Sequence, residues 1–192
     1  MTVDKDLFKN LPELQTPRLI LRRMTMDDAA DMFAYASDLE VTRFLDWPPH
    51  RSIEDSIRFL EGVMDAYAAG DPRSWAIVHR EDGRMIGTGG FLFWDDIANR
   101  SELGYAVSRS YWGQGLMSEA VPEMLRFGFE RMGLNRIEAR CNARNMASRR
   151  VLEKSGFNLE GTLRESIVQN GELSDMLLFG ILRREWRPPD GE

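Results

Sequence analysis

We predict an α/β (α+β) fold for this chain, with a mixed, mostly antiparallel central sheet of about seven strands flanked by about four helices. Two observations support this prediction. Strand-like segments follow one another through the turn dipeptides Asp82-Gly83 and Asn170-Gly171, which are typical of antiparallel hairpins. In addition, a strand–helix–strand passage leads from residues 101–108 through a long helix to residues 136–142. Such a passage places a parallel pair in an otherwise antiparallel set, so the sheet is expected to be mixed.

Composition is typical of a globular protein and argues against several classes. Hydrophobic residues make up 43% of the chain and charged residues 29%, which is an ordinary balance. The formal net charge of −6 argues against broad nucleic-acid binding, which needs a basic surface, and favours a cationic substrate. Cys141 is the single cysteine, so no intrachain disulfide is expected and a reducing, cytoplasmic location is the simpler interpretation.

No repeat, low-complexity segment or linker divides the chain. We therefore expect one domain over residues 1–192, with its core at about 16–186 and loose ends at 1–15 and 187–192. The first residues are interrupted by charges and a proline, which indicates neither a signal peptide nor a transit peptide. Since no window is apolar enough to span a bilayer, we expect no membrane partner.

The first half of the chain predicts one strand and then two helices. Residues 18–24 are rich in strand-forming side chains. Thr25 and Ser52 each precede a helical segment and are expected N-caps, with acidic residues in the first turn. The second helix carries apolar residues at steps of three and four and ends at Gly70. Between the helices, residues 47–50 include two prolines and are expected to be non-helical.

The second half predicts the remaining strands and two further helices. Strands are expected over residues 74–80, 85–94, 101–108, 136–142, 157–169 and 172–182. A long helix follows the glycine-bearing turn 111–115 and ends at Gly133, and Pro122 in its second turn is expected to bend the axis. A shorter helix begins after the cap Asn145 and ends at Gly156.

The passage from Glu102 to Glu119 is the most informative for function. A strand leads into the turn Gly113-Gln114-Gly115, and the turn opens a helix. Unpaired backbone N–H groups at a helix N-terminus, together with the helix dipole, favour binding of a phosphate or diphosphate. The same pattern is equally typical of an ordinary helix start with turn glycines. It lacks the Gly-Lys-Ser/Thr of a P-loop and the third glycine of a dinucleotide-binding fingerprint.

Four segments carry a wider similarity. They are Thr16-Pro-Arg-Leu-Ile-Leu-Arg22, the strand Glu102–Val107, the turn Trp112-Gly-Gln-Gly-Leu-Met117, and Asn145-Met-Ala-Ser148 leading to Glu153-Lys-Ser-Gly-Phe157. In this order they resemble the GNAT acetyltransferase superfamily, and more narrowly its RimJ/RimL ribosomal-protein N-acetyltransferase-like branch. The resemblance covers about residues 16–186. It implies the GNAT fold and an acetyl-CoA-dependent N-acetyltransferase, without a metal, that acts on a primary amine by direct attack in a ternary complex.

The resemblance also implies the residues that bind acetyl-CoA. The backbone amides of one turn would hold the diphosphate, and that turn comprises Trp112, Gly113, Gln114, Gly115, Leu116, Met117 and Ser118. A splay between strands 101–108 and 136–142 would expose Tyr105, Ala106 and Val107 to the pantetheine arm and the thioester carbonyl. Asn145 would contact the same arm. Arg150 would meet the phosphates, and its neighbours Arg149 and Lys154 could do so too, although the simpler role of all three is a solvated basic helix face. Of the three defining positions of the superfamily turn, this sequence matches the central glycine, Gly115.

Candidates for proton transfer come from the same segments. Glu102 is the leading candidate for the general base, and its simpler interpretation is a solvated carboxylate at a strand end. Ser148 is the candidate acid that meets the CoA sulfur, and its simpler role is a small residue in a capped first turn. The position that carries the base in some relatives falls on Ile167, which leaves Asp175 as a remote candidate. Cys141 is expected to be a buried structural thiol.

The acceptor is the least determined partner. The superfamily places it near the first two helices, their loop and the last hairpin, which implies Trp47, Arg51 and Trp94 here. One acceptor is the N-terminal amine of a protein or peptide, and the alternative is a polyamine, aminoglycoside or amino-acid amine. A catalytically silent acyl-CoA-binding regulatory module is a third hypothesis, motivated by Met117 and Pro122. We expect no nucleic-acid partner. A homodimer is one of the oligomeric states that the sequence allows.

Overall fold

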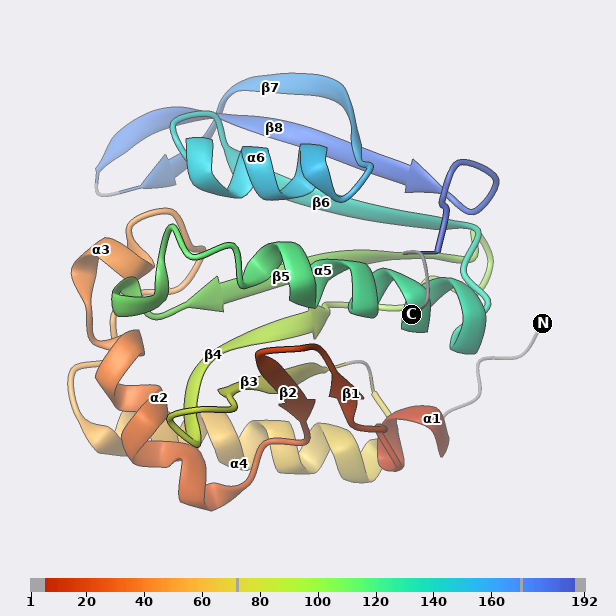
Figure 1. Ribbon diagram of the computed structural model, residues 1–192. Helices are drawn as coiled ribbons and strands as arrows, with labels where there is room; N and C mark the ends of the chain where they lie inside the picture. Colours follow the sequence, from red (N-terminus) through yellow and green to blue (C-terminus); the bar gives the residue numbers. More distant parts are fainter. Residues whose placement is uncertain (1–5, 72, 170, 189–192) are drawn as a thin grey trace.

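A central sheet organises the structure, a computed structural model that describes residues 6–71, 73–169 and 171–188 (Figure 1). In these residues the sheet has eight strands in the order β1-β2-β3-β4-β5-β6-β8-β7. Neighbouring strands are antiparallel except for the parallel pair β5 and β6. The strands are β1 (Leu14–Gln15), β2 (Leu19–Arg22), β3 (Ser74–His79), β4 (Arg84–Phe91), β5 (Arg100–Val107), β6 (Arg136–Asn142), β7 (Asn158–Gln169) and β8 (Glu172–Leu182). The predicted mixed sheet is confirmed, with β1 as the additional strand.

Helices cover both faces of this sheet. They are α1 (Asp6–Lys9), α2 (Ala29–Ala36), α3 (Leu39–Thr42), α4 (Ile53–Ala69), α5 (Met117–Arg126) and α6 (Met146–Lys154), with 3-10 turns η1 (Met26–Asp28) and η2 (Arg109–Tyr111) and a π-helical segment η3 (Phe127–Arg131). Tyr35 of α2 hydrogen-bonds Thr88 of β4, whereas Gly89 faces Met124 of α5 from the other side of the sheet. Thus α5 and α6 lie on one face, and α2 and α4 on the other (Figure 1).

The helix boundaries follow the local signals in the sequence. At the start of α4, the Asp55 carboxylate accepts hydrogen bonds from the N–H groups of Arg51 and Ser52, at 2.7 and 3.2 Å. The helix ends at Gly70, whose φ of 75° is the left-handed conformation that glycine adopts without strain. At the start of α6, Asn145 Oδ1 accepts from the Ser148 N–H at 3.1 Å. Each contact satisfies a backbone group that the helix itself leaves unpaired.

The N-terminal segment differs from the loose end that we expected over residues 1–15. From residue 6 onward it forms α1 and β1, and Phe8 is completely buried. The Phe8 ring meets the Trp94 and Phe127 rings edge-on, each with centroids 6.2 Å apart. The Trp75 indole also donates a hydrogen bond to the Pro12 carbonyl at 2.8 Å. A four-residue helix is too short to show a hydrophobic period, so its packing was not visible in the sequence.

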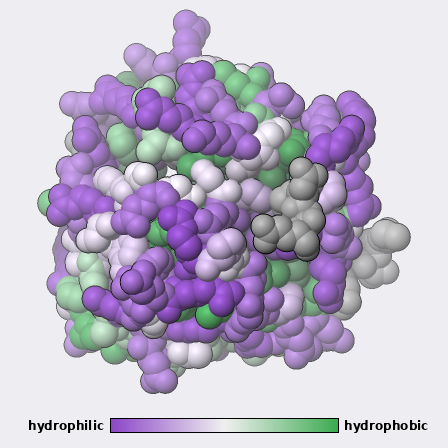
Figure 2. Space-filling view, viewed as in Figure 1, coloured by the Kyte–Doolittle hydropathy of each residue, from purple (hydrophilic) through white to green (hydrophobic). Residues whose placement is uncertain are grey.

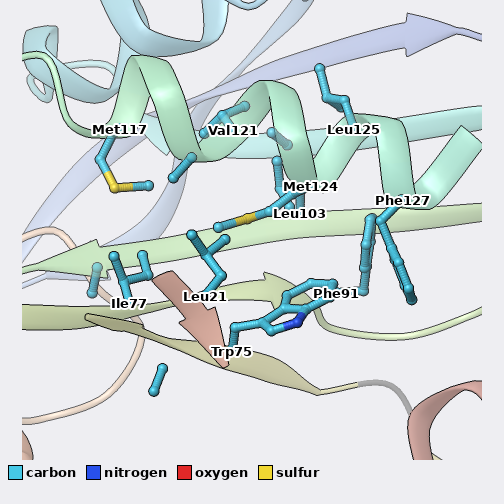
Figure 3. Close-up of a cluster of buried hydrophobic side chains, with 14 of the residues drawn as sticks. Leu21, Trp75, Ile77, Phe91, Leu103, Met117, Val121, Met124, Leu125 and Phe127 are labelled. Carbon is cyan, nitrogen blue, oxygen red and sulfur yellow. The ribbon is translucent and has the colours of Figure 1, made fainter. Parts of the chain in front are cut away.

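Helix α5 packs its apolar face against the sheet. Its buried side chains include Met117, Val121, Met124 and Leu125, and they lie over a layer of large apolar residues from the sheet (Figure 3). That layer includes Leu21, Trp75, Ile77, Phe91 and Leu103. Each fully buried side chain of this size contributes about 2 kcal/mol to folding. The core therefore fixes the position of α5, and with it the turn that precedes the helix.

The helix that contains Pro122 continues beyond α5. The structure places Pro122 inside α5 and gives the following residues, η3, a π-helical pattern. The helical course ends before Gly133, whose φ is 69°, as the sequence predicted. Irregular hydrogen bonding is common downstream of features that interrupt the α-helical ladder.

The parallel strands β5 and β6 separate along their length. Their pairing comprises Arg100 with Arg136, Ser101 with Ile137, and Glu102 with Glu138. Beyond Glu102, β5 continues to Val107 while pairing with β4, and β6 continues to Asn142 while pairing with β8. The splay that the family resemblance implied is therefore present. It leaves one backbone edge of β5 without a neighbouring strand in the described part of the chain.

Candidate active site

A cavity of about 590 Å³ lies at this splay, between β5, the start of α5 and α6. Figure 2 shows a band of weakly polar and hydrophobic residues between the regions of α6 and α5 on an otherwise hydrophilic face. The lining includes most of the residues expected to bind acetyl-CoA, namely Tyr105, Ala106, Val107, Trp112, Gly113, Gly115, Leu116, Met117, Ser118, Asn145, Ser148 and Arg150. Four lining residues come from α3 and its loop, which the sequence did not predict as a helix: Glu40, Val41, Phe44 and Leu45.

The turn before α5 presents a row of free donors. The N–H groups of residues 113–117 have no hydrogen-bond acceptor among the described residues, and the Ser118 N–H donates to the Gly115 carbonyl at 3.0 Å. Gly113 and Gly115 have φ values of 74° and 78°, and a Cβ at either position would meet no atom closer than 3.7 Å. The glycines thus permit the turn and keep its surface open. Consecutive free N–H groups at a helix N-terminus suit a diphosphate.

The Gln114 side chain turns away from this surface. Its amide donates to the Ser110 carbonyl at 3.1 Å, and the residue is not part of the cavity wall. Its backbone N–H remains one of the free donors described above. Gln114 therefore contributes to the turn through its main chain.

The free edge of β5 supplies further backbone groups. Hydrogen bonds from Leu92 N to the Glu102 carbonyl and from Ser108 N to the Ile86 carbonyl fix which residues pair with β4. Because paired and unpaired residues alternate along an antiparallel ladder, Ala106 faces β4 and Tyr105 faces the splay. The backbone groups of Ala106 therefore pair with β4 and are not available to the pantetheine arm, although the residue still lines the cavity. An extended chain with amide groups could pair with Tyr105 as an added strand would.

Tyr105 and Ser148 form the polar centre of the cavity. The Tyr105 Oη lies 3.0 Å from Ser148 Oγ and 3.3 Å from the Ser148 carbonyl oxygen. Burial raises the pKa of Tyr105 above its ordinary value, so the phenol stays protonated at neutral pH. Sequence reasoning had included Tyr105 for its backbone and missed this hydroxyl. A tyrosine on the splayed strand could have indicated a hydroxyl in the cavity, but its partner Ser148 lies on α6, far away in the sequence.

Cys141 lies on β6 next to this pair. It is buried, and burial raises the pKa of its thiol to about 11, while a hydrogen bond with Ser148 opposes the shift. A thiol with so high a pKa is a poor nucleophile at neutral pH. The structure agrees with the expected structural role of Cys141.

Glu102 occupies a different surface. It is the last residue of β5 that pairs with β6. Because side chains alternate along a strand, its side chain lies on the face of the sheet opposite to Tyr105. Its side chain is 14% exposed and forms an ion pair with Arg140 at 3.3 Å. Burial raises the pKa of Glu102 above its ordinary value, and Arg140 opposes that shift. The two expected catalytic residues, Glu102 and Ser148, are thus on opposite faces of the sheet at the splay.

Basic side chains line the outer part of the cavity. Arg144, Arg150 and Lys154 all contribute to its wall. Arg144 forms an ion pair with Glu172 at 2.8 Å, whereas Arg150 and Lys154 have no carboxylate within 4.0 Å among the described residues. Cations without partners beside the free N–H groups favour an anionic ligand. Arg150 and Lys154 belong to the basic set that the sequence indicated, and Arg144 extends it. The third member of that set, Arg149, pairs with Glu153 at 2.8 Å and is not part of the wall.

A second cavity of about 340 Å³ lies between the segment after α3 and the end of β7. Its wall includes Trp47, Asp46 and Ile167, and the two cavities share Leu45. Of the three residues expected to meet an acceptor, Trp47 lies here. Arg51 is exposed beside the cap of α4, and Trp94 packs against Phe8 in the core. Neither Arg51 nor Trp94 lines either of these two cavities, because helix capping and packing against the core hold them elsewhere.

The fold and the site together define a class of protein. A splayed parallel pair, an amide-lined turn at a helix start and half-buried hydroxyls between them suit a nucleotide carrier with an extended, amide-bearing arm. Among the described residues, no group of three or more His, Cys, Asp or Glu side chains is arranged to hold a metal ion. The helices of the described chain also include none that is long and apolar enough to cross a bilayer.

The chain belongs to the GNAT acetyltransferase family, whose domain matches residues 18–158. It is 35% identical to the uncharacterized N-acetyltransferase p20 of Bacillus licheniformis over 173 residues, 90% of this chain and 97% of the relative. It is 26% identical to the ribosomal-protein-serine acetyltransferase of Escherichia coli over 136 residues, 70% of this chain and 75% of the relative.

Solved structures show the same architecture. One is RimL, a ribosomal L7/L12 α-N-protein acetyltransferase in complex with coenzyme A, with a TM-score of 0.80 and 22% sequence identity. It covers 89% of this chain and 98% of the RimL chain. With relatives of this kind, the predicted similarity to the RimJ/RimL-like branch is confirmed. The protein is therefore a GNAT-type N-acetyltransferase.

Proposed function

We propose that this protein transfers the acetyl group of acetyl-CoA to the N-terminal amine of a protein or peptide, by direct attack in a ternary complex. The observation that carries the proposal is the row of free N–H groups at residues 113–117, which opens into the cavity beside the free edge of β5. Both features leave backbone groups without a partner in the described part of the protein, where such groups are usually paired. Together they match a diphosphate joined to an extended amide-bearing arm.

Each part of the cavity has a role in this proposal. The turn N–H groups would hold the diphosphate, and Arg150 and Lys154 would neutralise charge at its outer edge. The free backbone groups of Tyr105 would pair with the pantetheine arm. Asn145, which caps α6, lies in the same wall and would orient that arm. These assignments use residues that the sequence implicated.

The proton transfers are assigned to residues on both faces of the sheet. Acetyl-CoA supplies the activated acetyl group when bound. Glu102 would accept, directly or through one water, the proton that the attacking amine loses. Ser148, hydrogen-bonded to the protonated Tyr105, would donate a proton to the departing sulfur. The free Tyr105 N–H at the splay would stabilise the negative charge that develops on the carbonyl oxygen.

The acceptor would approach from the side of Glu102 and the second cavity. That cavity shares Leu45 with the first and combines apolar walls, such as Trp47, with the carboxylate of Asp46. A ribosomal-protein-serine acetyltransferase among the relatives favours a peptide N-terminus as the acceptor. The net charge of −6 also favours a cationic acceptor, and does so equally for a protein and a polyamine.

Two measurements test this proposal. Calorimetric titration with acetyl-CoA should show binding in the micromolar range, and the absence of binding would overturn the proposal. Transfer should then be measured to peptides with N-terminal serine or alanine, alongside spermidine and an aminoglycoside. Preferred transfer to a peptide supports the proposed acceptor, and preferred transfer to a small amine replaces it. Tight binding without transfer to any acceptor would indicate the regulatory module instead.

A further inference from the structure

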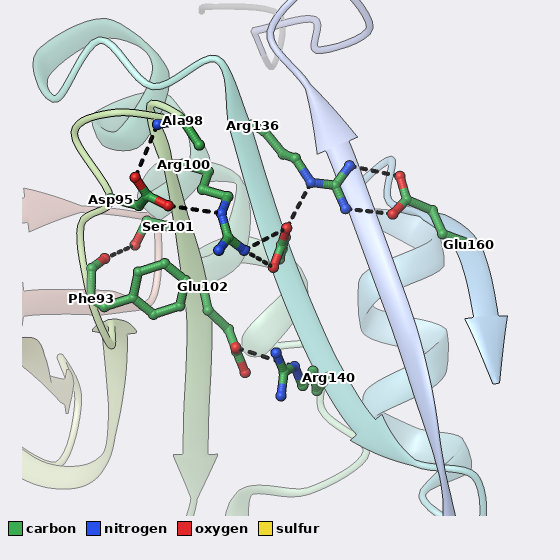
Figure 4. A network of polar contacts seen from close by, with 10 residues as sticks. Phe93, Asp95, Ala98, Arg100, Ser101, Glu102, Arg136, Arg140 and Glu160 are labelled. Atoms are coloured by element: carbon green, nitrogen blue, oxygen red, sulfur yellow. Dashed lines mark hydrogen bonds and ion pairs between the residues drawn. The ribbon is translucent and has the colours of Figure 1, made fainter. Parts of the chain in front are cut away.

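An arginine bridges the opening between β5 and β6. Arg140 lies on β6 two residues beyond Glu138, which is the last residue of β6 paired with β5. Successive side chains of a strand alternate, so Arg140 and Glu138 lie on the same face. From there Arg140 Nε reaches the Glu102 carboxylate across the splay, at 3.3 Å (Figure 4). The contact joins the two strands at the point where their backbones cease to pair.

The neighbouring arginines are committed to other carboxylates. Arg100 binds Asp95 and Glu138, at 3.2 and 3.1 Å, and Arg136 binds Glu138 at 2.8 Å and also Glu160 (Figure 4). This ionic network ties β5, β6 and β7 together at the paired end of the strands. Among the described residues, Arg140 is the one cation within 4.0 Å of the Glu102 carboxylate.

Four charged groups face Glu102. Arg140 and Glu138 come from β6, Arg100 from β5 itself, and Asp46 from the segment between α3 and α4. Burial and the two carboxylates favour the protonated form of Glu102, whereas the two arginines favour the ionised form. Arg100 is already neutralised by its own partners. Arg140 is therefore the main group that favours the ionised form of Glu102.

We propose that Arg140 is a positioning residue for the base: its ion pair holds the Glu102 carboxylate at the opening of the splay and keeps it ionised at neutral pH. This inference rests on the proposed function through the role of Glu102. It adds to that role a residue whose side chain is half-exposed and lines neither cavity. A base that must be buried to exclude water needs such a counter-charge, because burial alone favours its protonated, inactive form.

The test measures the titration of Glu102 directly and needs no acetyl-CoA. Glutamate carboxyl carbons are labelled with ¹³C and followed by NMR from pH 3 to 9, with Glu102→Gln used to assign the signal. In Arg140→Met the midpoint of Glu102 should rise by about one pH unit, as for loss of an opposite charge at this distance. Arg140→Lys keeps the charge and should recover at least half of that shift.

Arg126→Met is the matched control, since it removes an arginine from a surface ion pair with Glu123 on α5. It should leave the Glu102 midpoint unchanged. An unchanged midpoint in Arg140→Met, with the fold intact by circular dichroism, would overturn the proposal. If Arg140→Met does not fold, Arg140→Lys is compared with the wild-type protein instead. In that case, a Glu102 midpoint identical to that of the wild type, together with lost transfer, would overturn the proposal.

Activity provides the second readout. At a pH below the midpoint of Glu102, raising that midpoint by one unit lowers the ionised fraction of Glu102 tenfold. The acidic limb of the pH profile of kcat/KM, measured with an N-terminal-serine peptide, should therefore move up by one pH unit in Arg140→Met. A higher KM with an unchanged limb would overturn the proposal and assign Arg140 to acceptor binding. An acidic limb that persists in Glu102→Gln would instead reject Glu102 as the base. Absence of any transfer by the wild-type protein would count against the proposed function, while the NMR result on Arg140 would stand.

Discussion

The two ends of the β5–β6 pair differ in whether the backbones of the two strands are hydrogen-bonded to each other. At the closed end, residues 100–102 pair with residues 136–138, and arginines and carboxylates cross-link the strands (Figure 4). At the open end, the same two strands separate around a cavity with free N–H groups and half-buried hydroxyls. The closed end satisfies its polar groups internally, and the open end leaves them for a ligand. The comparison teaches that this sheet can bind a ligand where the two strands stop pairing with each other.

The largest effect is expected in the core beside the closed end. Phe8→Ala removes a completely buried ring that touches Trp94 and Phe127, and should lower the free energy of unfolding by about 3–5 kcal/mol. Phe59→Ala, at a half-exposed ring on α4, should cost less than about 1 kcal/mol. Urea denaturation measures both. A loss below about 1 kcal/mol for Phe8→Ala would mean that the N-terminal segment is dispensable.

Two glycine substitutions test whether the turn at the open end binds acetyl-CoA. Gly115→Val and Gly133→Val both place a β-branched residue at positive φ, with an expected cost in stability of about 1–2 kcal/mol each. Gly115 lines the cavity, so Gly115→Val should also weaken acetyl-CoA binding by at least about tenfold. Calorimetry at a temperature where both variants are folded measures the difference. Equal affinity in the two variants would contradict the assignment of the turn.

The ionic network at the closed end should matter for stability. Glu138 accepts hydrogen bonds from two arginines, and Glu138→Gln should lower the free energy of unfolding at pH 7 by about 1–2 kcal/mol. Glu153→Gln breaks an exposed pair with Arg149 and should cost less than about 0.5 kcal/mol. Urea denaturation of both variants gives the comparison. Equal losses would show that the network adds nothing to an ordinary surface pair.

The effect of Glu138 should also depend on pH. Burial alone would raise the pKa of Glu138, but hydrogen bonds from Arg136 and Arg100 hold it below its ordinary value. A carboxyl group with a lowered pKa stabilises the fold above the pKa that it has when unfolded, and this contribution is lost as the pH falls. The difference between wild type and Glu138→Gln should therefore be constant near neutral pH and shrink below about pH 4.5. A difference that grows on acidification would contradict this account.

The smallest expected effect is on proton donation at the open end. Ser148→Ala leaves the Tyr105 hydroxyl and the cap at Asn145 in place, so water or Tyr105 can supply the proton. Turnover should fall by less than about tenfold, while Tyr105→Phe combined with Ser148→Ala should fall further. Single-turnover kinetics with the peptide acceptor measures both variants. Wild-type turnover in the double variant would remove both hydroxyls from the acid role.

Features that depend on neighbours in the sequence could be predicted. The caps at Ser52 and Asn145, the end of α4 at Gly70 and the turn at Gly113–Gly115 follow from local backbone chemistry. The resemblance supplied the splay and most of the cavity wall. Short elements such as α1 and α3 were missed, because three or four residues show no period and are held by packing against the rest of the protein.

The sequence by itself determined the order of the longer strands and helices, their approximate boundaries and the open turn, since each depends on residues a few positions apart. Tertiary structure alone decided that Tyr105 meets Ser148, that Arg140 reaches Glu102 and that Trp94 packs against the core. These contacts join segments separated by tens of residues, and they depend on where the sheet and helices come together. Strand alternation could have placed Glu102 and Tyr105 on opposite faces, but only the packed sheet shows what each face meets.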